Sequence, residues 1–168
     1  MPISKSILRV MDNRIVINTG PLIALMRIQA LDIPGKLDRQ FLAPEEVRRE
    51  LEDGVDVGHP PVRPEWLDYR SLAAPLSPMA TSVLDSGEAA VIQLALEQGI
   101  VQVCIDEWKG RRMALAVGLK VAGVLGLLGM AKREGLIADV KPYVDRALAA
   151  GIRYHPELIR RFLDAIGE

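Results

Sequence analysis

Polar side chains that could hold a metal ion follow two β-branched runs of this sequence. Asn18 and Thr19 come directly after Arg14–Ile17, and Asp106 follows Ile100–Ile105. If both runs are strands of one parallel sheet, their carboxyl ends meet at the same edge, where open sheets bind ligands. Carboxylates that converge there repel one another unless a hard divalent cation such as Mg²⁺ lies among them.

Two further carboxylates lie on predicted helices. Glu88 follows the helix-start sequence Asp85-Ser86-Gly87, and Glu50 lies near the apolar edge of a helix predicted over Pro44–Glu52. Each candidate also has a simpler interpretation. Glu88 could be a first-turn acid that stabilises the helix dipole, Glu50 a surface charge, and Asp106 or Thr19 a helix cap. The hypothesis of a site therefore depends on their convergence.

Strands and helices alternate along the chain. Besides the two runs above, strands are predicted within Glu65–Leu76 and over Leu119–Val124. Further helices are predicted over Leu22–Ile28, Glu88–Gln98, Trp108–Val117, Gly126–Gly135, Asp145–Ala150 and Glu157–Ile166. Residues 1–13 are predicted to form an N-terminal arm and residues 53–64 a loop. The alternation predicts an α/β protein with a mostly parallel sheet covered by helices.

Composition narrows the class of protein. The chain has 168 residues, 49% of them apolar, which fits one folded domain and excludes a disordered chain. Its one cysteine, Cys104, excludes a disulfide framework, suits the cytoplasm and is interpreted as a core residue. The run Met113–Met130 is apolar, but Lys120 and four glycines make it a poor membrane span. A net charge of -1 argues against a polycation that coats DNA.

A basic segment follows Asp106. Between Trp108 and Arg133 the sequence contains no acid and six basic residues, Lys109, Arg111, Arg112, Lys120, Lys132 and Arg133. A basic rim beside an acidic pocket suits a polyphosphate backbone, although a solvated helix face would look the same. Gly123, Gly126 and Gly129 lack the dinucleotide-binding spacing, so helix–sheet packing explains them better.

Four stretches of the chain together resemble a known family. They are RIVINTGPLIALMRI, FLAPEEVRRELEDG, LDSGEAAVIQLALEQG and the long segment from VCIDEWKGRR to KPYVDRAL, in this order over roughly residues 14–165. The chain resembles PIN-domain proteins, which share the VapC-type nuclease fold. It is most similar to a PIN-like branch found beside antitoxin-like genes.

The resemblance implies a single PIN-like domain over residues 14–168 with a three-layer α/β/α fold. It implies Mg²⁺- or Mn²⁺-dependent cleavage of RNA, in a cytoplasmic toxin that forms a homodimer and is restrained by a small antitoxin-like protein. By position, the catalytic residues are Asn18, Glu50, Glu88 and Asp106, with the metal on Glu50, Glu88 and Asp106. Thr19, Lys109, Arg111 and Arg112 are expected to bind substrate.

One residue departs from the family pattern. The first acidic position of active PIN nucleases is usually Asp, and here it is Asn18. Asn keeps an oxygen ligand but lacks the charge, and a charge pair at about 4 Å is worth roughly 4 kcal/mol gross at a dielectric of 20. A catalytically weakened module that binds RNA or a protein therefore stays open as an alternative. A small-molecule phosphate or nucleotide binder is a further alternative, based only on Gly123–Gly129 and on analogy of fold.

Overall fold

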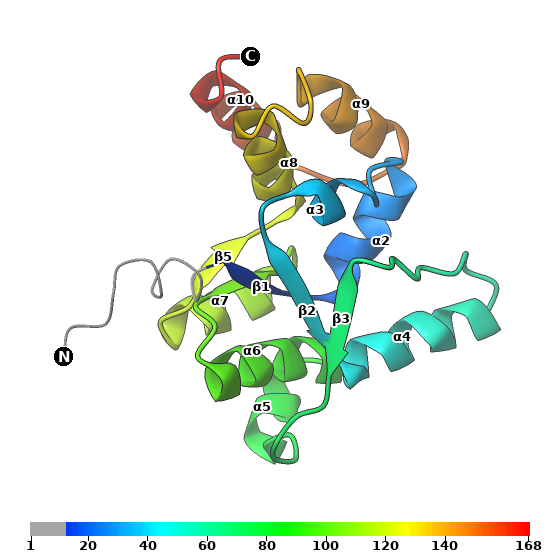
Figure 1. Cartoon of the computed structure of the whole chain (residues 1–168), viewed down its shortest axis with the longest axis vertical. Helices are drawn as coiled ribbons and strands as arrows, with labels where there is room; N and C mark the ends of the chain where they lie inside the picture. The colour runs from blue at the N-terminus through cyan, green and yellow to red at the C-terminus, as the bar shows by residue number, and fades with distance from the viewer. Residues whose placement is uncertain (1–12) are drawn as a thin grey trace.

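A five-stranded, all-parallel sheet forms the centre of the molecule. The computed structural model describes residues 13–168, so the predicted arm lies outside the described residues except for residue 13. The strands are β1 (Arg14–Ile17), β2 (Gln40–Pro44), β3 (Leu67–Arg70), β4 (Gln102–Cys104) and β5 (Lys120–Ala122), in the spatial order β3-β2-β1-β4-β5 (Figure 1). The predicted parallel sheet is confirmed, and all five strands end at one edge.

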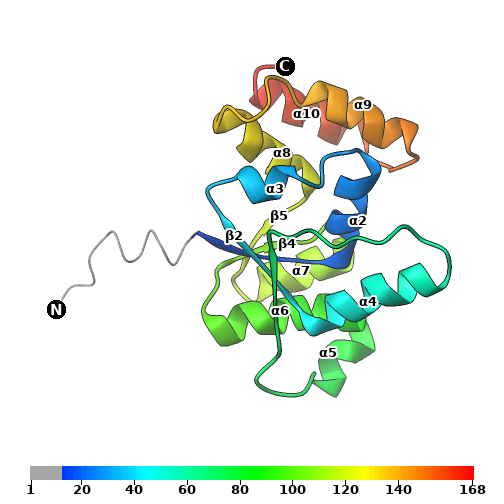
Figure 2. The ribbon, with the colours of Figure 1, turned by 45° about the vertical axis from the view of Figure 1, so that its right-hand side comes forward.

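Helices cover both faces of this sheet. They are α2 (Thr19–Arg27), α3 (Ile33–Lys36), α4 (Glu45–Asp56), α5 (Pro78–Val83), α6 (Ser86–Gln98), α7 (Trp108–Ala116), α8 (Val124–Arg133), α9 (Lys141–Ala149) and α10 (Pro156–Ala165). Figure 2 shows α6 and α7 on one face and α2, α3 and α8 on the other, with α9 and α10 outside that second layer. The three-layer α/β/α fold is thereby confirmed.

The strand order reverses between β1 and β4. From β1 the chain builds outward to β2 and β3, and it then returns to place β4 and β5 on the other side of β1. The Asn18 backbone N–H donates to the Cys104 carbonyl at 3.0 Å, which continues the β1–β4 ladder to the strand ends. Open parallel sheets form a crevice at such a reversal, so Asn18 and Asp106 lie at the natural binding position of this fold.

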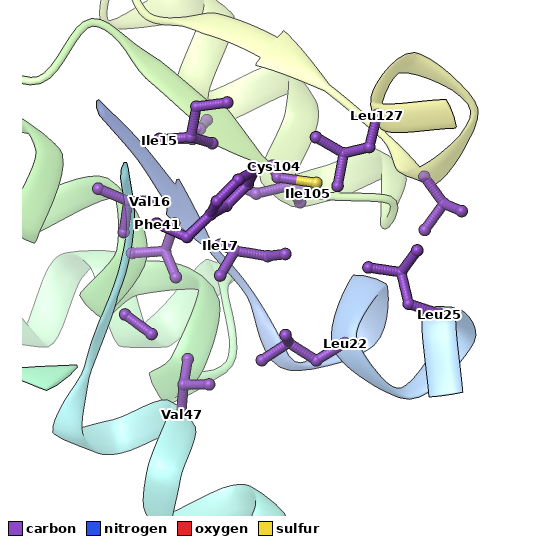
Figure 3. Packing of buried hydrophobic residues seen from close by; sticks show 14 of the residues in the cluster. Ile15, Val16, Ile17, Leu22, Leu25, Phe41, Val47, Cys104, Ile105 and Leu127 are labelled. Atoms are coloured by element: carbon purple, nitrogen blue, oxygen red, sulfur yellow. The ribbon is translucent and has the colours of Figure 1, made fainter. Parts of the chain in front are cut away.

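A continuous apolar core supports that edge. Ile15, Val16 and Ile17 of β1 are fully buried, as expected for a strand covered on both faces. Figure 3 shows side chains from β1, α2 and α8 packed together, and Cys104 lies among them. Cys104 is fully buried, which confirms its interpretation as a core residue.

Several element boundaries differ from the prediction. Helix α4 continues to Asp56 because no helix-breaking geometry occurs before Gly58, which has a positive φ of 97°. The predicted loop over residues 53–64 is therefore wrong in its first four positions. Strand β2 was not predicted, because its short apolar run ends in Pro44 and passes directly into α4. Helix α9 begins at Lys141, before the predicted Asp145.

The apolar run Met113–Met130 is divided among three elements, the end of α7, β5 and the start of α8. Within residues 13–168, no helix is long and apolar enough to cross a membrane.

Candidate functional site

Asn18 occupies a capping position without capping the helix. It precedes α2 with extended backbone geometry, yet its side chain makes no hydrogen bond to the first turn. Its Oδ1 is buried and has no hydrogen-bond partner among residues 13–168. An unsatisfied buried acceptor costs about 1–3 kcal/mol, so such an oxygen is available to a donor or a cation.

Glu50 joins the starts of two helices. The Thr19 hydroxyl donates to Glu50 Oε2 at 2.5 Å, and the Gly87 backbone N–H donates to Oε1 at 3.0 Å. Burial raises the pKa of Glu50, while these two hydrogen bonds oppose the shift. Glu50 is therefore no simple surface charge. Its carboxylate therefore binds residues directly adjacent in sequence to two other candidates, Thr19 next to Asn18 and Gly87 next to Glu88.

The absence of a side chain at Gly87 makes room for Glu50. A Cβ at this position would collide with the Glu50 carboxylate. We expect Gly87→Ala to displace that carboxylate and remove its backbone hydrogen bond, which raises the pKa of Glu50 further. An NMR titration of the Glu50 carboxyl measures this pKa. Gly20→Ala in α2 is the matched control, since a Cβ there meets nothing within 4 Å. An unchanged Glu50 pKa in Gly87→Ala contradicts the prediction.

Glu88 is a buried acid at the start of α6. It forms a capping box with Asp85, with Glu88 N–H to Asp85 Oδ1 at 2.7 Å and Asp85 N–H to Glu88 Oε2 at 3.3 Å. The interpretation of Glu88 as a first-turn acid is thus confirmed, but the residue is only 4% exposed. Burial first, and then the negative charge of Asp85 and of Glu107, raises the pKa of Glu88 to about 7.

Glu107 is a residue that the sequence analysis did not assign to the site. It is the N-cap of α7, where its side chain accepts from the Lys109 backbone N–H at 2.8 Å. Its charge and a side-chain hydrogen bond both act on Glu88, so the two carboxyl groups are neighbours. The only sequence signal was its place next to Asp106 at the end of a predicted strand.

Asp106 holds the start of α8. Its Oδ1 accepts from the Val124 backbone N–H at 3.0 Å, and the interpretation of Asp106 as the N-cap of α7 is wrong. Gly123 permits this contact, because a Cβ there would lie 2.5 Å from Oδ1. Burial raises the pKa of Asp106, against the opposing effects of the Val124 N–H and the positive charge of Arg111.

Arg111 and Tyr154 border Asp106. Arg111 is directed inward and donates through Nη1 to the Ile105 carbonyl at 2.7 Å. The Tyr154 hydroxyl is buried with no hydrogen-bond partner in the described part of the chain. Burial, and then the charge of Asp106, raises the pKa of Tyr154 to about 12. Tyr154 lies between α9 and α10, so nothing in the local sequence linked it to Asp106.

The predicted metal ligands do not form one compact group. Among residues 13–168, no three His, Cys, Asp or Glu side chains are close enough together to hold a metal ion. Glu50 is held by Thr19 and Gly87, and Asp106 by the Val124 N–H. Within the same residues, no Lys or Arg forms a salt bridge with Glu50, Glu88 or Asp106.

The chemistry of these donors nevertheless fits Mg²⁺ or Mn²⁺. All are oxygens, which hard cations prefer, and Mg²⁺ keeps several waters and needs only one or two carboxylates. Among these donors, the buried Oδ1 of Asn18 is the one without a hydrogen-bond partner in residues 13–168.

The basic segment is divided between two edges of the sheet. Lys109, Arg111 and Arg112 lie in the first turns of α7, at the carboxyl edge. Helix α8 crosses to the opposite edge, where Glu134 bonds the Asp38 N–H at 3.1 Å just before β2. The expected basic rim is therefore wrong for half of its members, namely Lys120 at the start of β5 and Lys132 and Arg133 at the end of α8.

The three spaced glycines have different neighbours. A Cβ at Gly126 would lie 3.3 Å from Ala122 of β5, which confirms helix–sheet packing there. Gly129 instead packs against the Phe162 ring of α10, where a Cβ would lie at 3.3 Å, so this contact is between helices.

An all-parallel sheet with amide and carboxylate side chains at its reversal point defines an α/β protein with an oxygen-rich polar site. The model of the DUF3368 family, a PIN domain, matches residues 14–168, and the chain belongs to this family. The resemblance to PIN domains is thus confirmed, and with it a nuclease-type fold. No functionally curated protein and no solved structure shows significant similarity to the chain.

Proposed function

We propose that this protein is a metal-dependent RNA endonuclease that hydrolyses phosphodiester bonds. The observation that carries the proposal is a set of three acids near the reversal of the sheet, the buried Glu88 and the partly buried Glu50 and Asp106, none of which forms a salt bridge among residues 13–168. The pKa values of Glu50, Glu88 and Asp106 are all raised, first of all by burial. A carboxylate that is withdrawn from water and has no basic partner favours binding of a cation, because the cation offsets the cost of desolvation.

Glu88, Asp106 and Glu50 would hold Mg²⁺ or Mn²⁺, directly or through water. When bound, the ion supplies an activated water and offsets negative charge on the scissile phosphate. Asn18 orients the attacking water through its unpartnered Oδ1. The exposed cations of Lys109 and Arg112 attract the phosphate backbone.

Two residues expected to bind substrate have positioning roles in this proposal. The Thr19 hydroxyl is engaged with Glu50, and the Arg111 guanidinium is engaged with the Ile105 carbonyl beside Asp106. Thr19 therefore holds the Glu50 carboxylate in place, and Arg111 keeps a positive charge close to Asp106. We also propose that the protein is a cytoplasmic homodimeric toxin restrained by a small antitoxin-like partner, a setting supported by the PIN family alone.

Cleavage of an RNA with both paired and unpaired regions tests the proposal. The wild-type protein is expected to cut this RNA with Mn²⁺ or Mg²⁺ and to stop when a chelator is added. Cutting that persists under chelation would indicate a contaminating or metal-independent nuclease. No cutting with either metal would contradict the proposed activity.

A non-catalytic binding module is the second candidate, and Asn18 is the observation that favours it. We expect Asn18→Asp to strengthen metal binding and to raise cleavage about tenfold or more, since it adds a charge to the pocket. Rates at several Mn²⁺ concentrations measure both effects. If only Asn18→Asp cuts RNA, the native protein is a binder. If Asn18→Asp is no faster than the wild type, Asn18 lies outside the metal site.

A further inference from the structure

An exposed tryptophan lies beside the proposed site. Trp108 is the first residue of α7 and is 62% exposed. It follows Asp106 and Glu107, whose side chains reach the start of α8 and Glu88. Trp108 therefore places an exposed indole at the same end of β4 as Asp106.

A cation covers one face of this ring. The guanidinium carbon of Arg112, one helical turn further along α7, lies 4.7 Å from the centre of the Trp108 ring. Such a cation–π contact restrains the indole at the surface. Because the residue as a whole is 62% exposed, the indole remains accessible for stacking. Lys109, the next residue of the chain, is a second exposed cation at the start of this helix.

This combination matches the chemistry of single-stranded nucleic acid. Unpaired bases stack on aromatic rings, and neighbouring basic side chains contact the phosphates. Duplex RNA keeps its bases stacked inside the helix and cannot offer one to the ring. A protein partner would need a wider apolar surface, but the other exposed apolar side chains of this helix, such as Leu115, lie at its far end.

We propose that Trp108 and Arg112 form a stacking platform for an unpaired base, which directs single-stranded RNA to the site. The choice of RNA rests on the proposed function. Stacking itself requires no cleavage, so the two proposals can fail separately.

The chain permits a direct optical test, because it has only two tryptophans. The Trp66 indole N–H is bonded to the Leu31 carbonyl at 2.8 Å, and its ring packs edge-on against Phe41. A chelator is added to prevent metal-dependent cleavage. Under these conditions a short mixed-sequence RNA without self-complementarity should quench the fluorescence of Trp108. Trp108→Ala should remove this quenching and weaken binding, measured by anisotropy of labelled RNA, roughly five- to a hundredfold.

Matched variants and ligands define the outcomes. Trp108→Phe should keep most of the affinity, and Leu115→Ala, an exposed apolar change on the same helix, should bind like the wild type. The same RNA annealed to its complement should not quench Trp108. Comparing single-stranded DNA of the same sequence with the RNA shows whether the 2′-hydroxyl contributes to binding. Absence of binding, equal binding by Trp108→Ala, or equal quenching by duplex RNA overturns the platform. RNA binding with this pattern but without metal-dependent cleavage overturns only the proposed nuclease activity.

Discussion

Replacing Asp106 by Asn should reduce metal-dependent RNA cleavage by a factor on the order of a hundred or more. The loss of one charge at about 4 Å from a divalent cation is worth several kcal/mol gross at a dielectric of 20, and each ~1.4 kcal/mol corresponds to tenfold in rate. The amide oxygen of Asn can still accept from the Val124 N–H, so the start of α8 should remain in place. Initial rates at saturating Mn²⁺ measure the effect.

Asp139→Asn is the matched control for this variant. Asp139 is exposed and lies between α8 and α9. The substitution therefore removes the same charge from the chain without changing the site. It should cleave at the wild-type rate, and both variants should keep the wild-type circular dichroism spectrum. If Asp106→Asn cleaves as fast as Asp139→Asn, then Asp106 does not belong to the catalytic machinery.

The metal-free protein should become less stable as the pH rises from about 4.5 to about 7. Glu88 has a pKa of about 7 in the folded state and 4.5 as its ordinary value. Between these values the folded state binds more protons than the unfolded state, so the free energy of unfolding falls with rising pH. The largest loss attributable to Glu88 is about 3 kcal/mol. The raised pKa values of Glu50 and Asp106 act in the same direction.

Denaturant unfolding of wild type and Glu88→Gln at several pH values checks this expectation. In Glu88→Gln the free energy of unfolding should decrease less with rising pH, because glutamine does not titrate. Glu97→Gln on the same helix should keep the wild-type pH dependence between about 4.5 and 7, since Glu97 is exposed and hydrogen bonds lower its pKa. In the proposed metal site, Mg²⁺ should raise the wild-type melting temperature more at pH 7.5 than at pH 5. Identical pH curves for wild type and Glu88→Gln would show that Glu88 is normally solvated.

The position of the site was predictable from the sequence, but its internal bonding was not. The apolar run before Asn18 and the run before Asp106 indicate neighbouring parallel strands, whose ends must share an edge. Glu50 illustrates the limit. Its helix periodicity shows only that it is near an apolar edge, whereas its bonds to Thr19 and Gly87 join residues 31 and 37 positions away.

The acids at the end of β4 show the same limit. Asp106 and Glu107 are equivalent in the local sequence, and either could cap α7. The packing of β5 and α8 brings the Val124 N–H to Asp106, so Glu107 becomes the cap and comes to lie beside Glu88. The charge of Asp106 acts on Tyr154, which lies between α9 and α10, and no local pattern encodes this proximity.

The sequence by itself determined the parallel α/β architecture, the edge that carries the polar residues and the presence of Asn where a PIN nuclease usually has Asp. The first two features follow from local periodicity and from the geometry of parallel strands, and the third follows from the resemblance to PIN domains. Only the tertiary structure decided which acids are buried, which backbone N–H groups hold them and where the basic residues lie. Burial and long-range hydrogen bonds depend on which segments pack together, and α8 carries Lys132 and Arg133 away from the site for that reason.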